Sequence, residues 1–232
     1  MDTTAPLVWI DCEMTGLDPF HDTIIEIACV VTDGNLNVLE QGESIVIHQP
    51  AAVMDAMGEW CQHHHGESGL TQSVLESKTT MADAEAAVLA LVKRHCRNPR
   101  TAVLAGNSVH SDRVFLSRYM PELTAFLHYR IVDVSSIKEL ARRWSPQVLA
   151  QMPPKKEKHR ALDDILESIA ELRFYRQHLF ASPSVSGPTG SQIWPRVAHF
   201  IQEGFGFIMW CVIGAFLVPI LFTVLSVLLS RQ

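Results

Sequence analysis

Hydrophobic residues follow two periods within the first 180 residues of the chain. Runs rich in β-branched residues predict strands over 7–12, 24–31, 101–105 and 131–134, with a third early strand or a hairpin from 36–39 and 44–48. Apolar residues at helical spacing predict helices over 81–95, 114–119, 136–144 and 161–178. Early strands followed by alternating helices and strands are typical of a mixed sheet covered by helices.

The last part of the chain has a different pattern. No charged residue occurs from Gly204 to Ser230, a run of 27 residues in which large apolar types dominate. As a helix this run would be about 40 Å long, more than the roughly 30 Å of hydrocarbon in a bilayer, and too long for an ordinary core helix. Eight of the 11 residues over 181–191 are Ser, Pro or Gly, which is typical of a linker. We therefore expect a folded domain over 1–180, a linker and juxtamembrane segment over 181–200, and a transmembrane helix over 201–230.

The position of this tail predicts a location. Only three residues, Ser230 to Gln232, follow the apolar run, so insertion would follow synthesis and leave the N-terminal domain on the cytosolic side, at the endoplasmic reticulum or the mitochondrial outer membrane. Residues 1–20 contain four acids and neither Lys nor Arg, which argues against a secretory signal and a mitochondrial presequence. If the tail is not used, the alternatives are the mitochondrial interior or the cytoplasm.

Composition and charge limit the kinds of site and ligand that the chain can have. Five scattered cysteines without a CxxC pair argue against a disulfide scaffold or structural zinc and favour a reducing compartment. The net charge is −6, yet the first 77 residues hold 13 acids and no Lys or Arg. Such a segment is a poor surface for long nucleic acids, which need many phosphate contacts, but it is suited to holding cations.

Four acids and one histidine stand where they could share a site. Asp11 and Glu13 lie two apart on the first strand, so both side chains point to the same face. Asp112 follows the strand over 101–105, and His159 and Asp164 lie at the start of the last helix. Oxygen ligands suit Mg²⁺ or Mn²⁺, and two such ions can assist an in-line phosphoryl displacement. A histidine titrates near neutrality and could serve as the general base.

Over about residues 6–180, the chain resembles the oligoribonucleases of the DEDDh 3′–5′ exonuclease superfamily. The matching segments are WIDCEMTGLD (9–18), IIEIA (24–28), GNSVHSD (106–112), YMPEL (119–123), HYRIVDVSSIKELARRW (128–144) and HRALDDI (159–165). The resemblance implies a ribonuclease H-like fold, with a mixed five-stranded sheet flanked by helices. It also implies hydrolysis of very short RNAs, dinucleotides above all, from the 3′ end to 5′-mononucleotides.

The resemblance assigns roles to particular residues. Asp11, Glu13, Asp112 and Asp164 correspond to the ligands of two divalent ions, and His159 corresponds to the general base on a mobile loop. Asp163 is the weaker ligand candidate, because adjacent helical residues point about 100° apart.

Substrate contacts follow from the same resemblance. They are Leu17 as an apolar wedge, Trp60 as a base-stacking residue, the 5′-phosphate cap of Ser108, Arg130, Ser135 and Ser136, and further contacts by His65 and Tyr129, partly across a homodimer interface. His63 and His64, beside His65, are expected in a loop rather than in a metal cluster.

Two alternatives stay open at this level. A related DEDDh exonuclease could trim longer RNA or DNA, although Leu17, Trp60 and the 128–144 segment favour short substrates. A catalytically silent, tail-anchored interaction module is the alternative of another class, and the retention of all five catalytic residues argues against it. The tail and Cys61 depart from the family pattern without removing a catalytic group.

Overall fold

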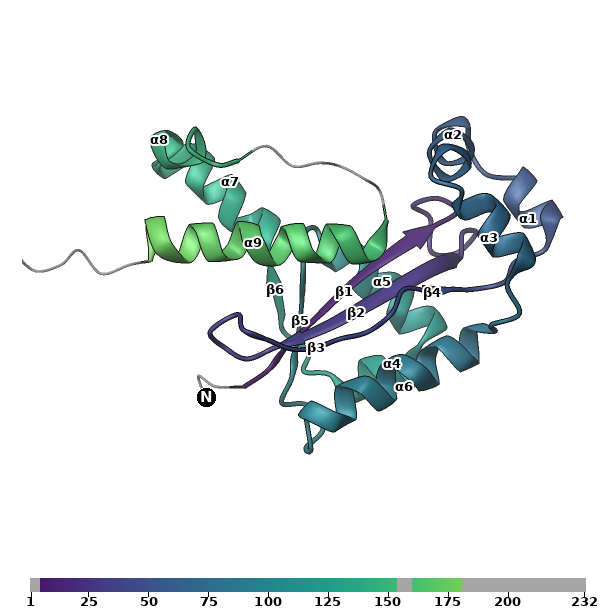
Figure 1. The fold of residues 1–232 in the computed structure, drawn as a ribbon, viewed down its shortest axis with the longest axis horizontal. Helices are drawn as coiled ribbons and strands as arrows, with labels where there is room; N and C mark the ends of the chain where they lie inside the picture. Colours follow the sequence, from purple (N-terminus) through teal and green to yellow (C-terminus); the bar gives the residue numbers. More distant parts are fainter. Residues whose placement is uncertain (1–4, 154–159, 181–232) are drawn as a thin grey trace, which may run out of the picture. The chain divides into compact units, whose positions relative to one another are not determined.

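The computed structural model of the chain describes residues 5–153 and 160–180. A mixed sheet lies at the centre of this part, with helices on both faces (Figure 1). The strands are β1 (Leu7–Met14), β2 (Ile24–Thr32), β3 (Val38–Gln41), β4 (Ile45–Val46), β5 (Val103–Gly106) and β6 (Ile131–Asp133). Their order across the sheet is β3-β2-β1-β5-β6, and β4 also pairs with β2. The predicted mixed α/β sheet flanked by helices is confirmed.

The predicted number of five strands is wrong, because one edge of the sheet is divided. Both β3 and β4 pair antiparallel with β2, β3 beside Val30 to Thr32 and β4 beside Glu26 and Ile27. Gly42 still donates its N–H to the Cys29 carbonyl at 2.9 Å, but the chain then leaves the edge. It returns at β4, next to Ser44, whose hydroxyl donates to Glu26 at 2.6 Å. The two short segments that could form a strand or a hairpin are thus two pieces of one edge.

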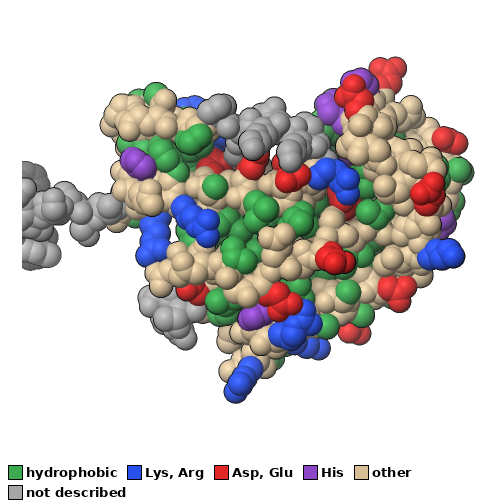
Figure 2. All heavy atoms as spheres, viewed as in Figure 1, with side chains coloured by type: hydrophobic (Ala, Val, Ile, Leu, Met, Phe, Trp, Pro, Cys, Tyr) green, Lys and Arg blue, Asp and Glu red, His purple; other side chains and the backbone are tan. Residues whose placement is uncertain are grey.

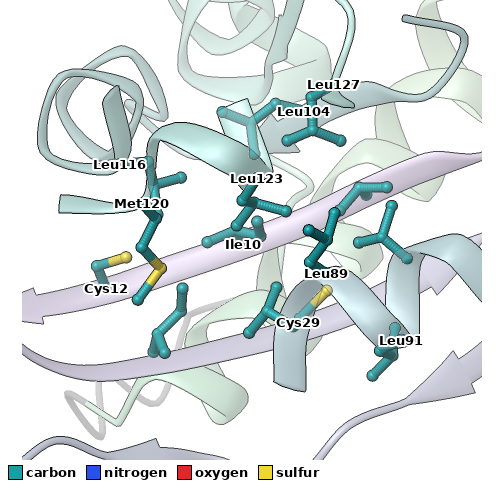
Figure 3. Packing of buried hydrophobic residues seen from close by; sticks show 14 of the residues in the cluster. Ile10, Cys12, Cys29, Leu89, Leu91, Leu104, Leu116, Met120, Leu123 and Leu127 are labelled. Carbon is teal, nitrogen blue, oxygen red and sulfur yellow. The ribbon is translucent and has the colours of Figure 1, made fainter. Parts of the chain in front are cut away.

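Helices cover both faces of the sheet in two layers, and the three helices that directly follow β4 form a separate group (Figure 1). The helices are α1 (Ala51–Asp55), α2 (Glu59–Glu67), α3 (Leu70–Glu76), α4 (Met81–His95), α5 (His110–Tyr119), α6 (Pro121–Phe126), α7 (Val134–Trp144), α8 (Pro146–Leu149) and α9 (Ala161–Leu179). The first layer, α4 to α6, packs on one face of the sheet, and α7 and α9 pack on the other. Figure 3 shows the first of these cores, where Ile10 and Cys12 of β1 face Leu116, Met120 and Leu123.

The alternation along β1 sets the position of the site. Val8, Ile10 and Cys12 belong to the core under α4 to α6, whereas Trp9 belongs to the core under α9. Asp11 and Glu13 continue the series of Trp9, so they lie on the α9 face, as period two requires. The register between β1 and β2 shifts at Glu13 and Met14, which ends regular pairing where the site begins.

The helix over 81–95 begins and ends where its pattern predicts. Thr80 accepts from the Asp83 N–H at 3.1 Å, and the Asp83 carboxylate accepts from the Thr80 N–H at 3.0 Å. This capping box satisfies two N–H groups that the first helical turn cannot pair.

The membrane location predicted from the tail requires correction. Within residues 5–153 and 160–180, no helix is long and apolar enough to cross a bilayer. The predicted linker and juxtamembrane segment over 181–200 and the predicted transmembrane helix over 201–230 lie outside the described residues. The tail-anchored location is therefore not retained, and the domain boundary near residue 180 stays a prediction.

Candidate active site

Three carboxylates from two elements meet at the end of β1. Asp11 and Glu13 come from β1, and Asp164 comes from the first turns of α9. One carboxylate oxygen of each lies within 4.8 Å of the others, and we call these three residues the acid cluster. Among the described residues, no other group of three acidic, His or Cys side chains comes together at distances suited to one metal ion. The structure thus brings together three of the four predicted ligands in one such group.

The fourth predicted ligand, Asp112, lies beside the acid cluster. It stands in the first turn of α5 and is buried. Its Oδ1 accepts a hydrogen bond from the Cys12 N–H at 3.0 Å, which joins α5 to the centre of β1. The negative charge of Asp112 is also one cause of the raised pKa of Asp11, after burial. Asp112 therefore adds a fourth carboxyl group to this part of the sheet.

Burial and mutual repulsion shift the titration of these acids. Burial, followed by the charges of Asp112 and Glu13, raises the pKa of Asp11 well above its usual range. Burial, followed by the charge of Glu26 and then Asp164, raises the pKa of Glu13 to about 8. Burial raises the pKa of Asp112 to about 7, against the opposing effect of the Cys12 N–H. Ionised acids are thus disfavoured here unless a cation compensates for their charge.

An ion pair between the buried Glu26 and the partly exposed Arg160 fixes the start of α9 against the sheet. Glu26 lies on β2 directly opposite Glu13 and has no exposed surface. The Arg160 guanidinium donates to both Glu26 oxygens, with Nη2 to Oε1 at 2.7 Å and Nε at 3.2 Å. The Ala161 N–H also points to Glu26 Oε2, at 3.4 Å. Arg160 precedes α9, so this pair holds the start of the helix that carries Asp164 against β2.

The role of Glu26 was not predicted from the sequence, although a signal existed. All nine residues of β2 are buried, and Glu26 is the one charged residue among them. A buried carboxylate needs a cationic partner. Arg160 supplies it from a segment 134 residues away, and no local pattern indicates that partner.

The predicted base, His159, lies outside the described residues. Its neighbour in the chain, Arg160, is described and is held by Glu26. The role of His159 therefore stays a prediction.

Two of the predicted base contacts are exposed apolar side chains near the end of β1. Leu17, in the loop between β1 and β2, is 84% exposed, and Trp60 on α2 is 59% exposed. The His64 ring stacks on the Trp60 indole with 3.9 Å between ring centroids. Large exposed apolar groups are typical of binding surfaces rather than of a core.

His65 differs from these two residues because it is only 2% exposed. Its Nε2 lies 3.0 Å from the Met14 carbonyl, so this nitrogen must be the donor. The bond fastens α2 to the last residue of β1. A direct contact of His65 with substrate stays a prediction.

The histidine run is helical, which corrects the expected loop. His63, His64 and His65 all lie within α2. The helix was missed because its polar residues leave no clear apolar stripe, and because Gly66 lowers its helix propensity. His63 pairs with Glu67 one turn later at 3.3 Å, an ordinary surface contact.

Three of the four residues predicted for the phosphate cap, Ser108, Ser135 and Ser136, lie just after the carboxyl ends of β5 and β6. Ser108 adopts a positive φ of 50°, and its N–H donates to Asp133 Oδ1 at 3.0 Å and to Ser135 Oγ at 2.5 Å. Ser135 and Ser136 form the first turn of α7, where Asp133 caps the helix by accepting from the Ser135 N–H. Asp133 therefore already uses two N–H groups that could otherwise bind an anion. The Ser108 and Ser135 hydroxyl oxygens lie 3.0 Å apart, and the Ser135 hydroxyl points to Asn107 Oδ1 at 3.4 Å.

Arg130 and Tyr129 stand just before β6 on the surface. Tyr129 is 73% exposed, and its ring stacks on His128. The Arg130 guanidinium lies over the Tyr129 ring, 5.4 Å from its centroid. The pair presents an aromatic face and a forked cation, which suits a nucleotide base and its phosphate.

A buried polar network connects the cap with α9. Asn107 Nδ2 donates to the Ser168 hydroxyl at 2.7 Å and points to Glu171 at 3.3 Å. The Ser168 hydroxyl in turn donates to the Asp164 carbonyl at 2.8 Å. Glu171 also accepts from Tyr175 at 2.8 Å and lies 3.8 Å from Lys138 on α7. The residue next to Ser108 is thus tied to the helix that carries Asp164.

The acid cluster has the donor set of a divalent-cation site. Carboxylate oxygens are hard ligands, and several of them on rigid elements suit Mg²⁺ or Mn²⁺. The raised pKa values of Glu13 and Asp112 are the response expected of such ligands when no cation balances them. On the face of the molecule shown in Figure 2, Lys and Arg side chains lie scattered among acidic ones.

Solved structures share this fold. Exonuclease I of E. coli in complex with a dA16 oligonucleotide matches with a TM-score of 0.59 at 15% identity, over 75% of this chain and 41% of that one. Exonuclease I of Methylocaldum szegediense matches with a TM-score of 0.57 at 18% identity, over 76% and 41%. The chain thus spans about two fifths of these enzymes, and at such identities the likeness concerns the fold alone.

Sequence comparisons identify the family. The profile of the exonuclease family of the RNase T type matches residues 8–172. The mitochondrial oligoribonuclease of Homo sapiens is 52% identical over 174 residues, which cover 75% of this chain and 73% of that protein. The oligoribonuclease of Mycolicibacterium paratuberculosis is 52% identical over 198 residues, which cover 85% and 91%. These matches favour a nuclease over a silent interaction module, and the chain belongs to the exonuclease family, among the oligoribonucleases.

Proposed function

We propose that this protein is a 3′–5′ exoribonuclease that degrades very short RNAs, dinucleotides above all, to 5′-mononucleotides. The observation that carries the proposal is the acid cluster, in which oxygens of Asp11, Glu13 and Asp164 lie within 4.8 Å of one another. The oligoribonuclease relatives support the choice of short RNA as substrate.

The chain's own acids are proposed to hold two divalent ions. Asp11, Glu13, Asp112 and Asp164 are the proposed ligands. When bound, Mg²⁺ or Mn²⁺ supplies electrostatic stabilisation for the attacking and leaving oxygens of an in-line displacement. The Glu26–Arg160 pair supports this arrangement, because it fixes the start of α9 against β2.

Proton transfer is assigned to His159. An imidazole can accept a proton from the attacking water near neutral pH. His159 precedes Arg160, which Glu26 holds at the edge of the acid cluster. The HRALDDI segment over 159–165, which resembles that of the family, supports the assignment.

Substrate binding is assigned to two groups of residues. Leu17 and Trp60 would contact the bases, since both are exposed apolar groups near the end of β1. Ser108, Arg130, Ser135 and Ser136 would bind the 5′-phosphate through hydroxyls and a guanidinium. Such a closed 5′ end limits substrate length, because a longer strand would collide with the cap. Tyr129 and His65 would complete the contacts, partly across a homodimer.

A length series tests this proposal against its main rival, trimming of long strands. RNAs of two to seven nucleotides with a 5′-phosphate would be incubated with Mn²⁺ at equal concentration. We expect the dinucleotide to be degraded fastest, and its 5′-hydroxyl counterpart more slowly. The Asp11→Asn variant serves as the control for contaminating nuclease. A rate that rises steadily with length would overturn the short-substrate proposal in favour of the rival.

A further inference from the structure

The Asp22 carboxylate joins the two sides of the loop that carries Leu17, while Asp18 makes local bonds to the Phe20 N–H and the His21 ring. The loop runs over residues 15–23, between the end of β1 and the start of β2. Asp22 Oδ1 accepts from the Thr15 hydroxyl at 2.9 Å, and Asp22 Oδ2 accepts from the Asp18 N–H at 2.9 Å. The two bonds stand on either side of Leu17 in the sequence. The carboxylate thus fixes the positions from which Leu17 projects.

Gly16 shows how closely the loop folds over this carboxylate. A Cβ at Gly16 would lie 2.4 Å from Asp22 Oδ2 and 2.7 Å from Oδ1. No real side chain tolerates contacts this short, so the loop requires glycine at this position because of the close approach. The residue before Leu17 is therefore packed directly on Asp22.

The backbone of Asp22 is itself held in place. Its N–H donates to the Asp18 carbonyl at 2.7 Å, and its carbonyl accepts from the Tyr119 hydroxyl at 2.6 Å. Tyr119 ends α5, the helix whose first turn holds Asp112. At the base of the loop, Thr15 and Thr23 exchange two further bonds, each 3.0 Å long. Asp22 is thus a rigid anchor for the exposed tip of the loop.

We propose that Asp22 is a positioning residue for substrate, which holds the exposed Leu17 side chain at the place where it meets the bases of a dinucleotide. The inference rests on the proposed function, in which Leu17 contacts the bases. Asp22 does not belong to the acid cluster, and its carboxylate faces the loop. Ordering a loop before binding lowers the entropic cost of association. Asp22 therefore acts on substrate affinity and leaves the chemical step unchanged.

The Asp22→Asn variant isolates this role. The amide keeps the shape of the carboxylate but offers one acceptor oxygen, so its NH₂ group would face either the Thr15 hydroxyl or the Asp18 N–H. We expect KM for a dinucleotide to rise at least about tenfold with kcat within about twofold, since losing a hydrogen bond to a charged group costs about a factor of ten or more. The p-nitrophenyl ester of a nucleoside 5′-monophosphate has no second base, and its kinetics should change by less than about twofold.

Asp33→Asn is a matched control. Asp33 organises the turn between β2 and β3 in the same manner, accepting from the Asn35 and Asn37 N–H groups at 2.8 and 2.9 Å. This variant should lose similar local structure and keep the KM for the dinucleotide. An equal rise in KM for both variants, or an equal effect on both substrates, would overturn the proposal.

A double variant tests whether Asp22 acts through Leu17. In a Leu17→Ala background, the Asp22→Asn change should alter KM by less than about twofold, because the side chain to be positioned is missing. Full additivity of the two changes would contradict the inference. Gly16→Ala, which pushes on the same carboxylate, should reproduce the rise in KM if Asp22→Asn folds poorly.

The outcomes separate this inference from the proposed function. A wild-type protein that fails to cleave dinucleotides overturns the proposed function. A wild-type protein that cleaves them, together with an Asp22→Asn variant of unchanged KM, overturns the positioning role alone.

Discussion

The acid cluster and the polar network around Asn107 lie on the same face of the sheet but differ in how their buried polar groups are compensated. In the cluster, like charges are buried together, and the pKa of Glu13 rises to about 8. In the network, Asn107, Ser168 and Glu171 satisfy one another with hydrogen bonds. The first arrangement costs folding free energy until a cation binds, whereas the second stabilises the fold. The comparison separates residues selected for chemistry from residues that hold the chemistry in place.

Neutralising one acid of the cluster should have the largest effect, and it should change turnover and stability in opposite directions. Asp11→Asn, Glu13→Gln and Asp164→Asn should each lower dinucleotide turnover by at least about 10³-fold, because several kcal/mol of electrostatic stabilisation are lost. In the absence of metal, the same variants should melt at a higher temperature than the wild type, since repulsion is relieved. Turnover with Mn²⁺ and thermal unfolding measure the two effects.

Asp163→Asn is the control for this set. Asp163 is adjacent to Asp164 but does not belong to the acid cluster. Turnover within about threefold of the wild type is expected. A loss as large as that of Asp164→Asn would exchange the roles of the two residues.

Removing Arg130 should have an intermediate effect. Arg130→Ala should raise KM for a 5′-phosphorylated dinucleotide by about 10- to 100-fold, because a charge-assisted hydrogen bond contributes about 1.5–3 kcal/mol. The 5′-hydroxyl dinucleotide should bind equally well to the variant and to the wild type. Measuring KM for both substrates would show whether the cap binds the 5′-phosphate. An equal rise in KM for both substrates would count against that role.

Breaking the network should change stability more than chemistry. Asn107→Ala removes the donor that reaches Ser168 and Glu171, and it should lower the free energy of unfolding by about 1–3 kcal/mol. Urea unfolding would measure this loss. The exposed Asn98 offers a control, whose Ala variant should lie within about 0.5 kcal/mol of the wild type. A higher stability for Asn107→Ala would contradict the comparison.

A further expected effect is a pH dependence of stability confined to the cluster. Glu13 binds its proton more tightly in the folded state, with a pKa of about 8 against an ordinary 4.5. The folded state therefore holds more protons between these values, and the stability of the metal-free protein should fall as pH rises from about 5 through 8. A shift of about 1 kcal/mol would move the melting temperature by about 2–4 °C.

Two comparisons isolate the source of this pH dependence. Saturating Mn²⁺ should abolish it, because the cation favours the ionised acids. Glu13→Gln should weaken it without metal. A melting temperature that rises between pH 5 and 8 would show that other groups dominate.

Much of the fold could be predicted from the sequence because local signals agreed with tertiary packing. The helix over Met81–His95 has both a capping box and an apolar stripe, so its two ends are defined by the chain itself. The period of β1 places Asp11 and Glu13 on one face, and the structure places Asp164 beside them. The helix ends and the shared face of Asp11 and Glu13 depend on residues close together in sequence or on a strand's fixed alternation. The place of Asp164 beside them joins distant segments and follows from the family resemblance.

Other features depend on distant partners and could not be predicted. The pairing of Glu26 with Arg160 joins residues 134 positions apart, and the bond of His65 to Met14 joins residues 51 apart. Helix α2 has little amphipathic character and is held by such contacts, so its sequence pattern predicts a loop instead of a helix. The positive φ of Ser108 follows from the bonds of its N–H to Asp133 and Ser135.

The divided edge of the sheet limits how the described part of the chain can associate. A second chain seeking to extend the sheet would meet runs of four residues at β3, two at β4 and three at β6. Runs this short form poor templates for strand addition, so the edges resist aggregation by β-pairing. Two copies of the described part of the chain would therefore have to recognise each other through side chains instead of through a shared sheet.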